Sequence, residues 1–312
     1  MALVLGIDTS NYTTSAAIYD TDENTIEQAK MLLPVKSGDC GIRQSDAVFH
    51  HTRQLPSVLS ELDFKGRKID AVAVSSTPRE AEGSYMPCFL AGVSVASAIS
   101  TVNNIPFYTF SHQQGHIAAA AYGCNHTELL NNPFIAFHVS GGTTEALLVK
   151  PSQSSVINAE LISETQDLNA GQLVDRTGVM LGLDFPAGIE LEKLANTYSG
   201  NIKVKPTLKG SDCCLSGFQN KAAKLYEETG DKTYVSAFVL KAISRTLIAM
   251  AESLINKYGN LPLLFAGGVM SNQLIKTDIL KHFNAYFAPP QFSADNAAGI
   301  AFLGAQKFLS ER

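Results

Sequence analysis

The feature that most constrains the fold is a pattern that occurs twice along the chain. Residues 2–20 read ALVLGIDTSNYTTSAAIYD, and residues 134–150 read FIAFHVSGGTTEALLVK. Each is an apolar run, a turn rich in glycine and hydroxyl side chains, and a second apolar run, which predicts a β-hairpin. The two hairpins are more than a hundred residues apart. We therefore expect two related halves, each opening with a hairpin.

Strands and helices alternate after each hairpin. In the first half, residues 69–77 predict a buried strand, and residues 89–110 predict a helix rich in small side chains, a proline-marked turn and another strand. In the second half, residues 231–259 predict a long amphipathic helix, and residues 261–272 a strand that runs into a double-glycine turn. This order predicts a layered α/β fold with duplicated mixed-sheet halves. We expect one lobe from residues 1–128 plus 296–312 and a second from residues 129–295.

Composition excludes several classes of protein. The net charge of −5 over 312 residues gives no sign of a nucleic-acid binder, so a local patch or another subunit would have to supply the positive charge. The cysteines number five, with no C-x-x-C pair, which argues against a disulfide framework or a thiolate zinc site. We expect neither a signal peptide nor a membrane-spanning run of about 18 apolar residues. We expect a cytoplasmic protein with no membrane partner.

Three turns are suited to close contact with phosphate. They lie at Gly6–Ser15, Ser140–Thr144 and Ala266–Val269. Glycine lets backbone N–H groups reach a phosphate without an intervening Cβ, and hydroxyl groups add donors. Three such turns, two of them closing related hairpins, are typical of the actin-like ATPase and sugar-kinase (ASKHA) superfamily. We therefore expect that two-lobed fold and an adenine nucleotide.

A pair of histidines stands out in SHQQGHIAAA, residues 111–120. The alanine run favours helix, and residues four apart lie on one helix face, so His112 and His116 point the same way. They are either polar surface residues or two ligands of one metal.

Several motifs together resemble one family over nearly the whole chain. They are HQQGHIAAA, VSGGTTEALLV, AGQLVDRTGVMLGLDFPAGIELEKLA, LSGFQNKA, AGGVMSNQLI and SADNAAGIAF. Their order is similar to that of the TsaD/Gcp family, once called O-sialoglycoprotein endopeptidases. The resemblance implies an acyltransferase that moves a threonylcarbamoyl group from its adenylate to N6 of adenosine in tRNA, with tRNA and related ASKHA or helper subunits as partners.

The resemblance also implies a set of site residues. One divalent metal, iron or zinc, would be held by His112, His116 and Asp295. His138 is either a fourth ligand or an ordinary histidine on a strand edge. The nucleotide or acyl-adenylate would contact the following residues: Val139, Ser140, Gly141, Gly142, Thr143, Asp175, Gly188, Gly267, Gly268 and Asn272. Asp175 could instead be a solvated helix charge, and Asn272 could be the N-cap of the next helix as well as a ligand.

The chain departs from the family pattern at the first turn. Relatives carry Cys, Asp and Glu where this chain has Asn11, Tyr12 and Thr13. Asp8 keeps the first acidic position and is the one candidate catalytic residue. We therefore expect slow ATP turnover, which Tyr12→Asp with Thr13→Glu should raise.

Two alternatives to the transferase remain. The missing acids favour a non-catalytic, nucleotide- and metal-binding paralogue that regulates the true enzyme. A metallopeptidase is less favoured, because Gln113 stands where zinc peptidases of the H-E-x-x-H type carry a glutamate base.

Overall fold

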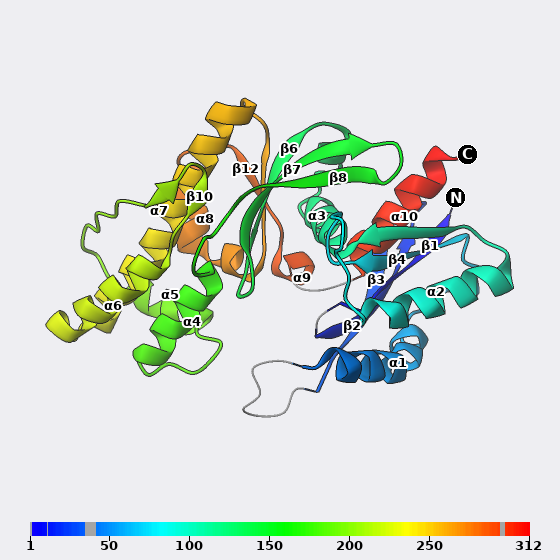
Figure 1. Cartoon of the computed structure of the whole chain (residues 1–312), viewed down its shortest axis with the longest axis horizontal. Coiled ribbons are helices and arrows are strands. Elements are labelled where there is room, and N and C mark those ends of the chain that lie inside the picture. The colour runs from blue at the N-terminus through cyan, green and yellow to red at the C-terminus, as the bar shows by residue number, and fades with distance from the viewer. Residues whose placement is uncertain (1, 11, 35–41, 294–296) are drawn as a thin grey trace. The chain divides into compact units, whose positions relative to one another are not determined.

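The computed structural model describes residues 2–10, 12–34, 42–293 and 297–312, in two compact units (Figure 1). Unit 1 contains Met1–Asn132, Lys150–Ala159 and Gln291–Arg312, and unit 2 contains Pro133–Val149 and Glu160–Pro290. The stretch Lys150–Ala159 therefore lies in unit 1, whereas the sequence placed it in the second lobe. None of the helices in the described ranges has both the length and the apolarity needed to cross a membrane.

Unit 1 is built on a five-stranded sheet in the order β3-β2-β1-β4-β5. The β1–β2 hairpin is antiparallel, as the sequence predicts, and β4 and β5 continue the sheet in parallel. The bounds of its elements are β1 Leu3–Asp8, β2 Thr13–Asp20, β3 Thr25–Leu32, α1 Gln44–Ser60, β4 Ala71–Thr77, α2 Phe89–Asn103, β5 Phe107–Ser111, α3 His112–Gly123, η1 Thr127–Asn131 and α10 Ala298–Ser310.

Every residue of strand β1 is buried. Since successive side chains point to opposite sides of a sheet, both faces of the strand are covered. Leu5 and Ile7 pack into the core that includes residues of α1 and α2. Gly6 faces α10, where a Cβ would lie 2.4 Å from the backbone nitrogen of Ala301, so only glycine fits. Helix α10 thus packs directly on β1, and the strand ends inside the unit at Asp8.

Unit 2 repeats this plan, with a sheet in the order β12-β11-β6-β7-β8. The β6–β7 hairpin is antiparallel, and β11 and β12 add in parallel. Both sheets therefore place their strands in the order third, second, first, fourth, fifth, which confirms the expectation of two related halves. The remaining bounds are β6 Phe134–Val139, β7 Thr144–Ser152, β8 Val156–Glu164, α4 Ala170–Met180, α5 Gly188–Asn196, β9 Leu208–Lys209, β10 Asp212–Cys213, α6 Ser216–Thr229, α7 Lys232–Tyr258, β11 Leu263–Ala266, η2 Gly268–Ser271, α8 Gln273–Leu280, β12 Ala285–Phe287 and α9 Pro290–Ser293.

The core of unit 2 lies between its sheet and its helices. Phe137, Phe265 and Phe287 stack across β6, β11 and β12, with ring centroids 4.6 Å and 5.2 Å apart. The apolar face of α7, which the sequence predicts from its 3.6-residue period, is buried in the same core. This packing fixes the carboxyl ends of β6 and β11, where two of the predicted turns begin.

Candidate functional site

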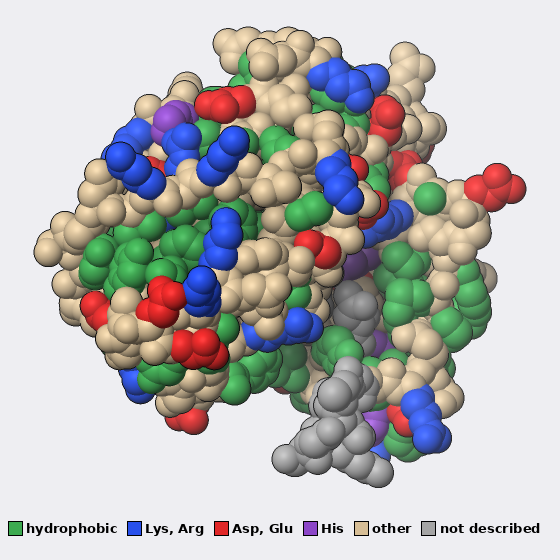
Figure 2. Space-filling model, turned by 60° about the vertical axis from the view of Figure 1, so that its left-hand side comes forward, with side chains coloured by type: hydrophobic (Ala, Val, Ile, Leu, Met, Phe, Trp, Pro, Cys, Tyr) green, Lys and Arg blue, Asp and Glu red, His purple; other side chains and the backbone are tan. Residues whose placement is uncertain are grey.

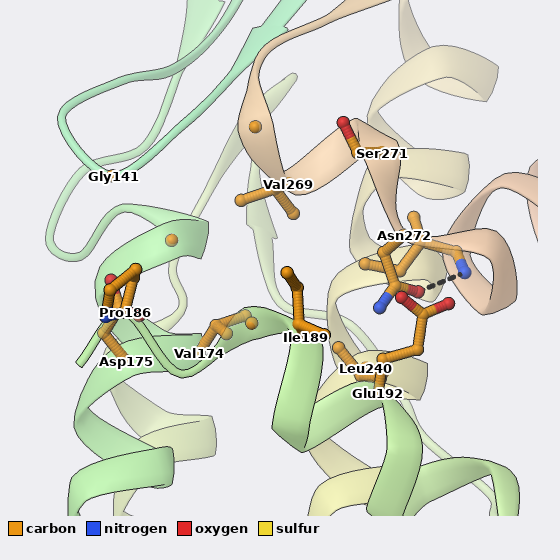
Figure 3. Close-up of a pocket in the computed structure, with 14 residues that line it drawn as sticks. Gly141, Val174, Asp175, Pro186, Ile189, Glu192, Leu240, Val269, Ser271 and Asn272 are labelled. Atoms are coloured by element: carbon orange, nitrogen blue, oxygen red, sulfur yellow. Dashed lines mark hydrogen bonds between the residues drawn. The ribbon is translucent and has the colours of Figure 1, made fainter. Parts of the chain in front are cut away.

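A pocket of about 310 Å³ in unit 2 contains many of the residues predicted to bind a nucleotide (Figure 3). Its volume lies at the lower end of the range for small-molecule sites, roughly 300–1,000 Å³. In Figure 3, Asp175 and Pro186 lie at one end, Asn272 and Glu192 lie at the other, and Val174, Ile189 and Val269 lie between them. The pocket therefore has polar ends and an apolar middle, an arrangement that suits a nucleoside.

The predicted phosphate turn lies at the rim of this pocket. The Ser140 hydroxyl accepts hydrogen bonds from the N–H groups of Gly142 (3.3 Å) and Thr143 (3.1 Å), which closes the turn. Gly141 lines the pocket, whereas Val139 is buried at the end of β6. Bare backbone in a Gly-Gly turn can approach a phosphate closely.

Helix α4 begins directly beneath the turn. The Gly171 N–H donates to the Ser140 carbonyl at 3.0 Å, and a Cβ on Gly171 would lie 2.6 Å from both N and Cα of Gly141. Residue 171 must therefore be glycine for the helix and the turn to pack in this way. The positive end of the α4 dipole is thereby placed beside the turn, where it favours an anion.

Two carboxylates line the pocket, and one of them was missed in the sequence. Asp175 Oδ1 accepts the Ala187 N–H at 3.0 Å, and Oδ2 accepts no hydrogen bond from the described residues. Glu192 Oε1 accepts the Gln273 N–H at 2.7 Å and so joins α5 to the start of α8. The only sequence signal for Glu192 is its position one helical turn after Gly188. Each carboxylate keeps an oxygen that can accept a hydrogen bond from a hydroxyl or amine of a ligand.

The Gly-Gly turn after β11 completes the pocket. Gly268 lines it, but Gly267 does not: Gly267 has φ +103°, and a Cβ there would lie 2.2 Å from the Val139 carbonyl oxygen. Gly267 thus allows β11 to pass close to β6. Asn272 is both a lining residue and the N-cap of α8, since its side chain accepts the Ile275 N–H at 3.0 Å. Asn272 is therefore the N-cap of α8, and its role as a nucleotide ligand stays a prediction.

The histidine pair lies in unit 1. Ser111 caps α3 in a capping box with Gln114, so the helix begins at His112. The Nε2 atoms of His112 and His116 are 2.9 Å apart, and Nδ1 of His112 lies 2.8 Å from Oδ2 of Asp8. The structure thus brings both predicted histidines together, with a carboxylate behind one ring.

Asp8 is a buried carboxylate with several donors around it. It accepts the N–H and hydroxyl of Ser10 at 3.0 Å each and the Ser75 hydroxyl at 2.5 Å. These contacts fix the orientation of the carboxylate that faces His112. Asp8 therefore supports the histidine pair from behind.

The structure gives less support to the other residues predicted to bind the metal. Asp295 lies outside the described residues. His138, in unit 2, has Nδ1 at 4.0 Å from the Glu145 carboxylate, its cross-strand partner. Within the described part of the chain, no group of three or more His, Cys, Asp or Glu side chains forms a metal cluster. Metal binding therefore stays a prediction that depends on the His112–His116 pair.

Solved structures share the fold at low sequence identity. A full-length HypF in its phosphate- and nucleotide-bound form matches 99% of this chain with a TM-score of 0.61 and 13% identity, and the chain spans 46% of that protein. Component A of the Acidaminococcus fermentans (R)-2-hydroxyglutaryl-CoA dehydratase matches over the full length of both chains, with a TM-score of 0.58 and 12% identity. A Streptomyces griseus ROK-family glucokinase in complex with glucose and AMPPNP gives 0.54 at 11% identity, over 97% of this chain and 99% of its own.

These neighbours confirm the ASKHA fold, and a sequence-family comparison goes further. The model of the tRNA N6-adenosine threonylcarbamoyltransferase TsaD matches residues 24–302, which is most of the chain. That range contains the histidine pair, the Ser140–Thr143 turn and every residue of the unit 2 pocket. The chain therefore belongs to the TsaD family of tRNA N6-adenosine threonylcarbamoyltransferases.

Proposed function

We propose that this protein transfers a threonylcarbamoyl group from threonylcarbamoyl-adenylate to N6 of adenosine in tRNA. The observation that carries the proposal is the unit 2 pocket, which places a Gly-Gly turn and a helix N-terminus at one side and carboxylates at its ends. An adenylate presents the matching groups: a phosphate, a ribose diol and a flat base. Family membership supplies the reaction type.

In this proposal the chain acts by binding and orienting its substrate. The Gly141 N–H, which donates to no described residue, contacts the phosphate, Asp175 accepts a hydrogen bond from the ribose, and Val269 and Ile189 cover the base. The N6 amine attacks the carbamoyl carbon, a C–N bond forms, the bond from that carbon to the phosphate oxygen breaks, and AMP leaves. The amine proton is released. Positioning of this kind can supply a large part of a rate enhancement.

Of the residues expected to hold a divalent metal, His112 and His116 have a spacing compatible with binding one ion. Two nitrogens that bind one ion at about 2.0–2.1 Å, with an angle of about 90–110°, lie about 2.9–3.4 Å apart. The observed Nε2–Nε2 distance is 2.9 Å. A carboxylate on the far nitrogen, as Asp8 provides for His112, is the usual support of a metal-binding histidine. A divalent ion at this pair would supply a Lewis acid for phosphate and carbonyl oxygens.

Complementation tests the reaction. The gene should restore growth and modified tRNA in a strain depleted of its own threonylcarbamoyltransferase, whereas Asp175→Ala should not. A purified protein that binds adenylate and tRNA but transfers nothing, with or without helper subunits, would contradict the proposal.

Metal content is tested separately. Protein purified without chelator should contain close to one iron or zinc ion per chain, and His112→Ala should lose it. Wild-type protein that carries no metal and cannot be loaded would refute the metal site.

A regulatory paralogue is the second candidate, favoured by the first turn. Tyr12 is exposed there and Thr13 is buried at the start of β2, where relatives carry acids. This alternative predicts binding of nucleotide and metal without transfer, together with stimulation of an active family member.

A further inference from the structure

A second cavity in unit 2, of about 500 Å³, lies beside the nucleotide pocket. It is formed by the end of α5, residues 197–202, α7 and α8, and the two cavities share Leu240. The Glu192–Gln273 hydrogen bond joins the two helices that border both of them. The polar side chains that line this cavity, which we call the basic groove, are those of Asn196, Tyr198, Asn201, Lys241, Ser244, Gln273, Thr277, Asp278 and Lys281.

The segments that form the basic groove carry a net positive charge in a chain whose net charge is −5. Residues 190–209, 231–252 and 273–290 together contain nine Lys and Arg and five acidic residues, Glu190, Glu192, Asp231, Glu252 and Asp278. Figure 2 brings this side of unit 2 forward and shows Lys and Arg side chains at several places, with Asp and Glu side chains among them. The proposed RNA substrate requires such a local excess of positive charge, because phosphate contacts dominate RNA affinity.

The acidic residue that lines the basic groove, Asp278, is neutralised by a lysine. Both oxygens of Asp278 lie 3.0 Å from Lys241 Nζ, and Oδ2 also accepts the Ser244 hydroxyl at 2.6 Å. Burial raises the pKa of Asp278, but the hydrogen bonds from Ser244 and Lys241 lower it further than burial raises it. Asp278 is therefore ionised and compensated by Lys241.

Four other cations around the groove form no close ion pair within the described part of the chain, although the Lys281 charge also helps to lower the pKa of Asp278. Lys203, Lys205, Arg245 and Lys281 form no ion pair with the described acidic residues, and the Arg245 guanidinium lies 3.2 Å from the His282 ring. Lys281 lines the groove, Lys203 directly follows its lining residue Ile202, and Arg245 is one turn beyond Lys241 on α7. These cations can each approach a different phosphate.

Neutral donors and an aromatic ring lie among the cations. The side chains of Asn196, Asn201 and Thr277 form no hydrogen bond within the described part of the chain. Tyr198 is held in place by its stacked neighbour Tyr234, with ring centroids 5.1 Å apart and planes at 28°. Amides, hydroxyls and aromatic rings between lysines are the groups that contact the sugar–phosphate backbone of nucleic acids.

We propose that the basic groove binds the phosphate backbone of the tRNA substrate. This rests on the proposed function for the identity of the RNA, but the groove itself lies outside the nucleotide pocket. The slope of log K against log salt concentration measures the number of phosphate contacts. Removing each cation that contacts a phosphate should reduce the magnitude of this slope by about 0.7–0.9. Binding of the adenylate should not depend on these cations.

The test uses the full chain and an unmodified tRNA transcript, with fluorescence anisotropy between 50 and 200 mM salt. The groove variant is Lys203→Ala, Arg245→Ala and Lys281→Ala combined, and it leaves the Lys241–Asp278 pair intact. A matched control with the same change in charge replaces Lys221, Lys224 and Lys257 of α6 and α7 by Ala. We expect the groove variant to bind tRNA at least 10-fold more weakly with a slope smaller by about 2–3, and the control to change less than 3-fold.

Other outcomes overturn the proposal in distinguishable ways. Equal losses in the groove variant and the control would show a general charge effect and no site. If the wild type and the groove variant bind tRNA equally well, the groove is not the tRNA site, and the proposed function stands. If the wild type binds no tRNA, the result also counts against the proposed function. Polyglutamate serves as a probe for an acidic protein partner. If the groove variant loses polyglutamate binding while its tRNA binding is unchanged, the groove binds an acidic protein and the proposal is wrong. ADP binding, measured in parallel, should stay within 2-fold in both variants.

Discussion

Replacing Gly171 by alanine tests whether the contact between α4 and the phosphate turn determines nucleotide affinity. A Cβ at this position would lie 2.6 Å from N and Cα of Gly141 and 2.7 Å from the Ser140 carbonyl oxygen. All three are backbone atoms, so no side chain can rotate away to make room. The turn or the helix must move.

The size of the shift sets the expected effect. Restoring ordinary contact requires a movement of about 0.8 Å, since a Cβ rarely comes closer than about 3.4 Å to such atoms. The 3.0 Å hydrogen bond from Gly171 N–H to Ser140 would then exceed hydrogen-bonding distance. Overpacking of this kind costs about 1–3 kcal/mol of unfolding free energy. One displaced hydrogen bond to a charged phosphate is worth about 1.5–3 kcal/mol, or roughly 10- to 100-fold in affinity.

The assay pairs calorimetry with ADP and urea unfolding. Gly171→Ala should bind ADP 10- to 100-fold more weakly while its unfolding midpoint falls modestly. Gly217→Ala is the matched control, because Gly217 is also the second residue of a helix, α6, and a Cβ there would meet no heavy atom within 4 Å. That variant should keep wild-type affinity and gain up to about 1 kcal/mol of stability. Wild-type ADP affinity in Gly171→Ala would refute the role of the turn.

Three further predictions follow from single side chains. Asp175→Ala removes the pocket carboxylate and the acceptor of the Ala187 N–H, so ADP should bind at least 10-fold more weakly by calorimetry; equal affinity would remove Asp175 from the site. Tyr12→Asp should raise a slow, divalent-dependent ATP turnover in a phosphate-release assay. Fast hydrolysis by the wild type would show that the first turn is misinterpreted. Thr13 is unsuitable for restoring an acid because it is buried. Asp278 has a lowered pKa, so the stability that it contributes is present above its usual value of 3.8 and is lost as the pH falls below it. Asp278→Asn should therefore flatten the acid side of a urea-midpoint profile, and an unchanged slope would contradict this.

Local sequence predicts the parts of this fold that local chemistry determines. The two hairpins follow from apolar runs on either side of glycine- and hydroxyl-rich turns, and α7 follows from its apolar period. The start of α3 could also have been placed from the sequence, because Ser111 and Gln114 have capping-box spacing. Such signals depend on residues within a few positions of each other.

Contacts between segments that are far apart in the sequence could not be predicted from it. Glu192 borders the pocket because α5 packs near the start of α8, 81 residues further along the chain. Asp8 meets His112 across 104 residues, through the parallel sheet of unit 1. The basic groove collects its cations from three separate segments, so the overall charge of the chain conceals it. In each case the pairing depends on tertiary packing, which periodicity and composition do not report.

The position of Asp8 bears on what the divergent first turn changes. Its carboxylate is surrounded by hydrogen-bond donors from Ser10 and Ser75, and it faces His112 Nδ1. None of these contacts involves Tyr12 or Thr13, so the replacement of acids at those positions leaves the support of the histidine pair intact. The unit 2 pocket contains no residue of the first turn. Divergence at the first turn should therefore slow the hydrolysis of ATP while adenylate and metal binding persist. A transferase with weak ATPase activity would show this combination, whereas a protein that has lost its site would bind neither ligand.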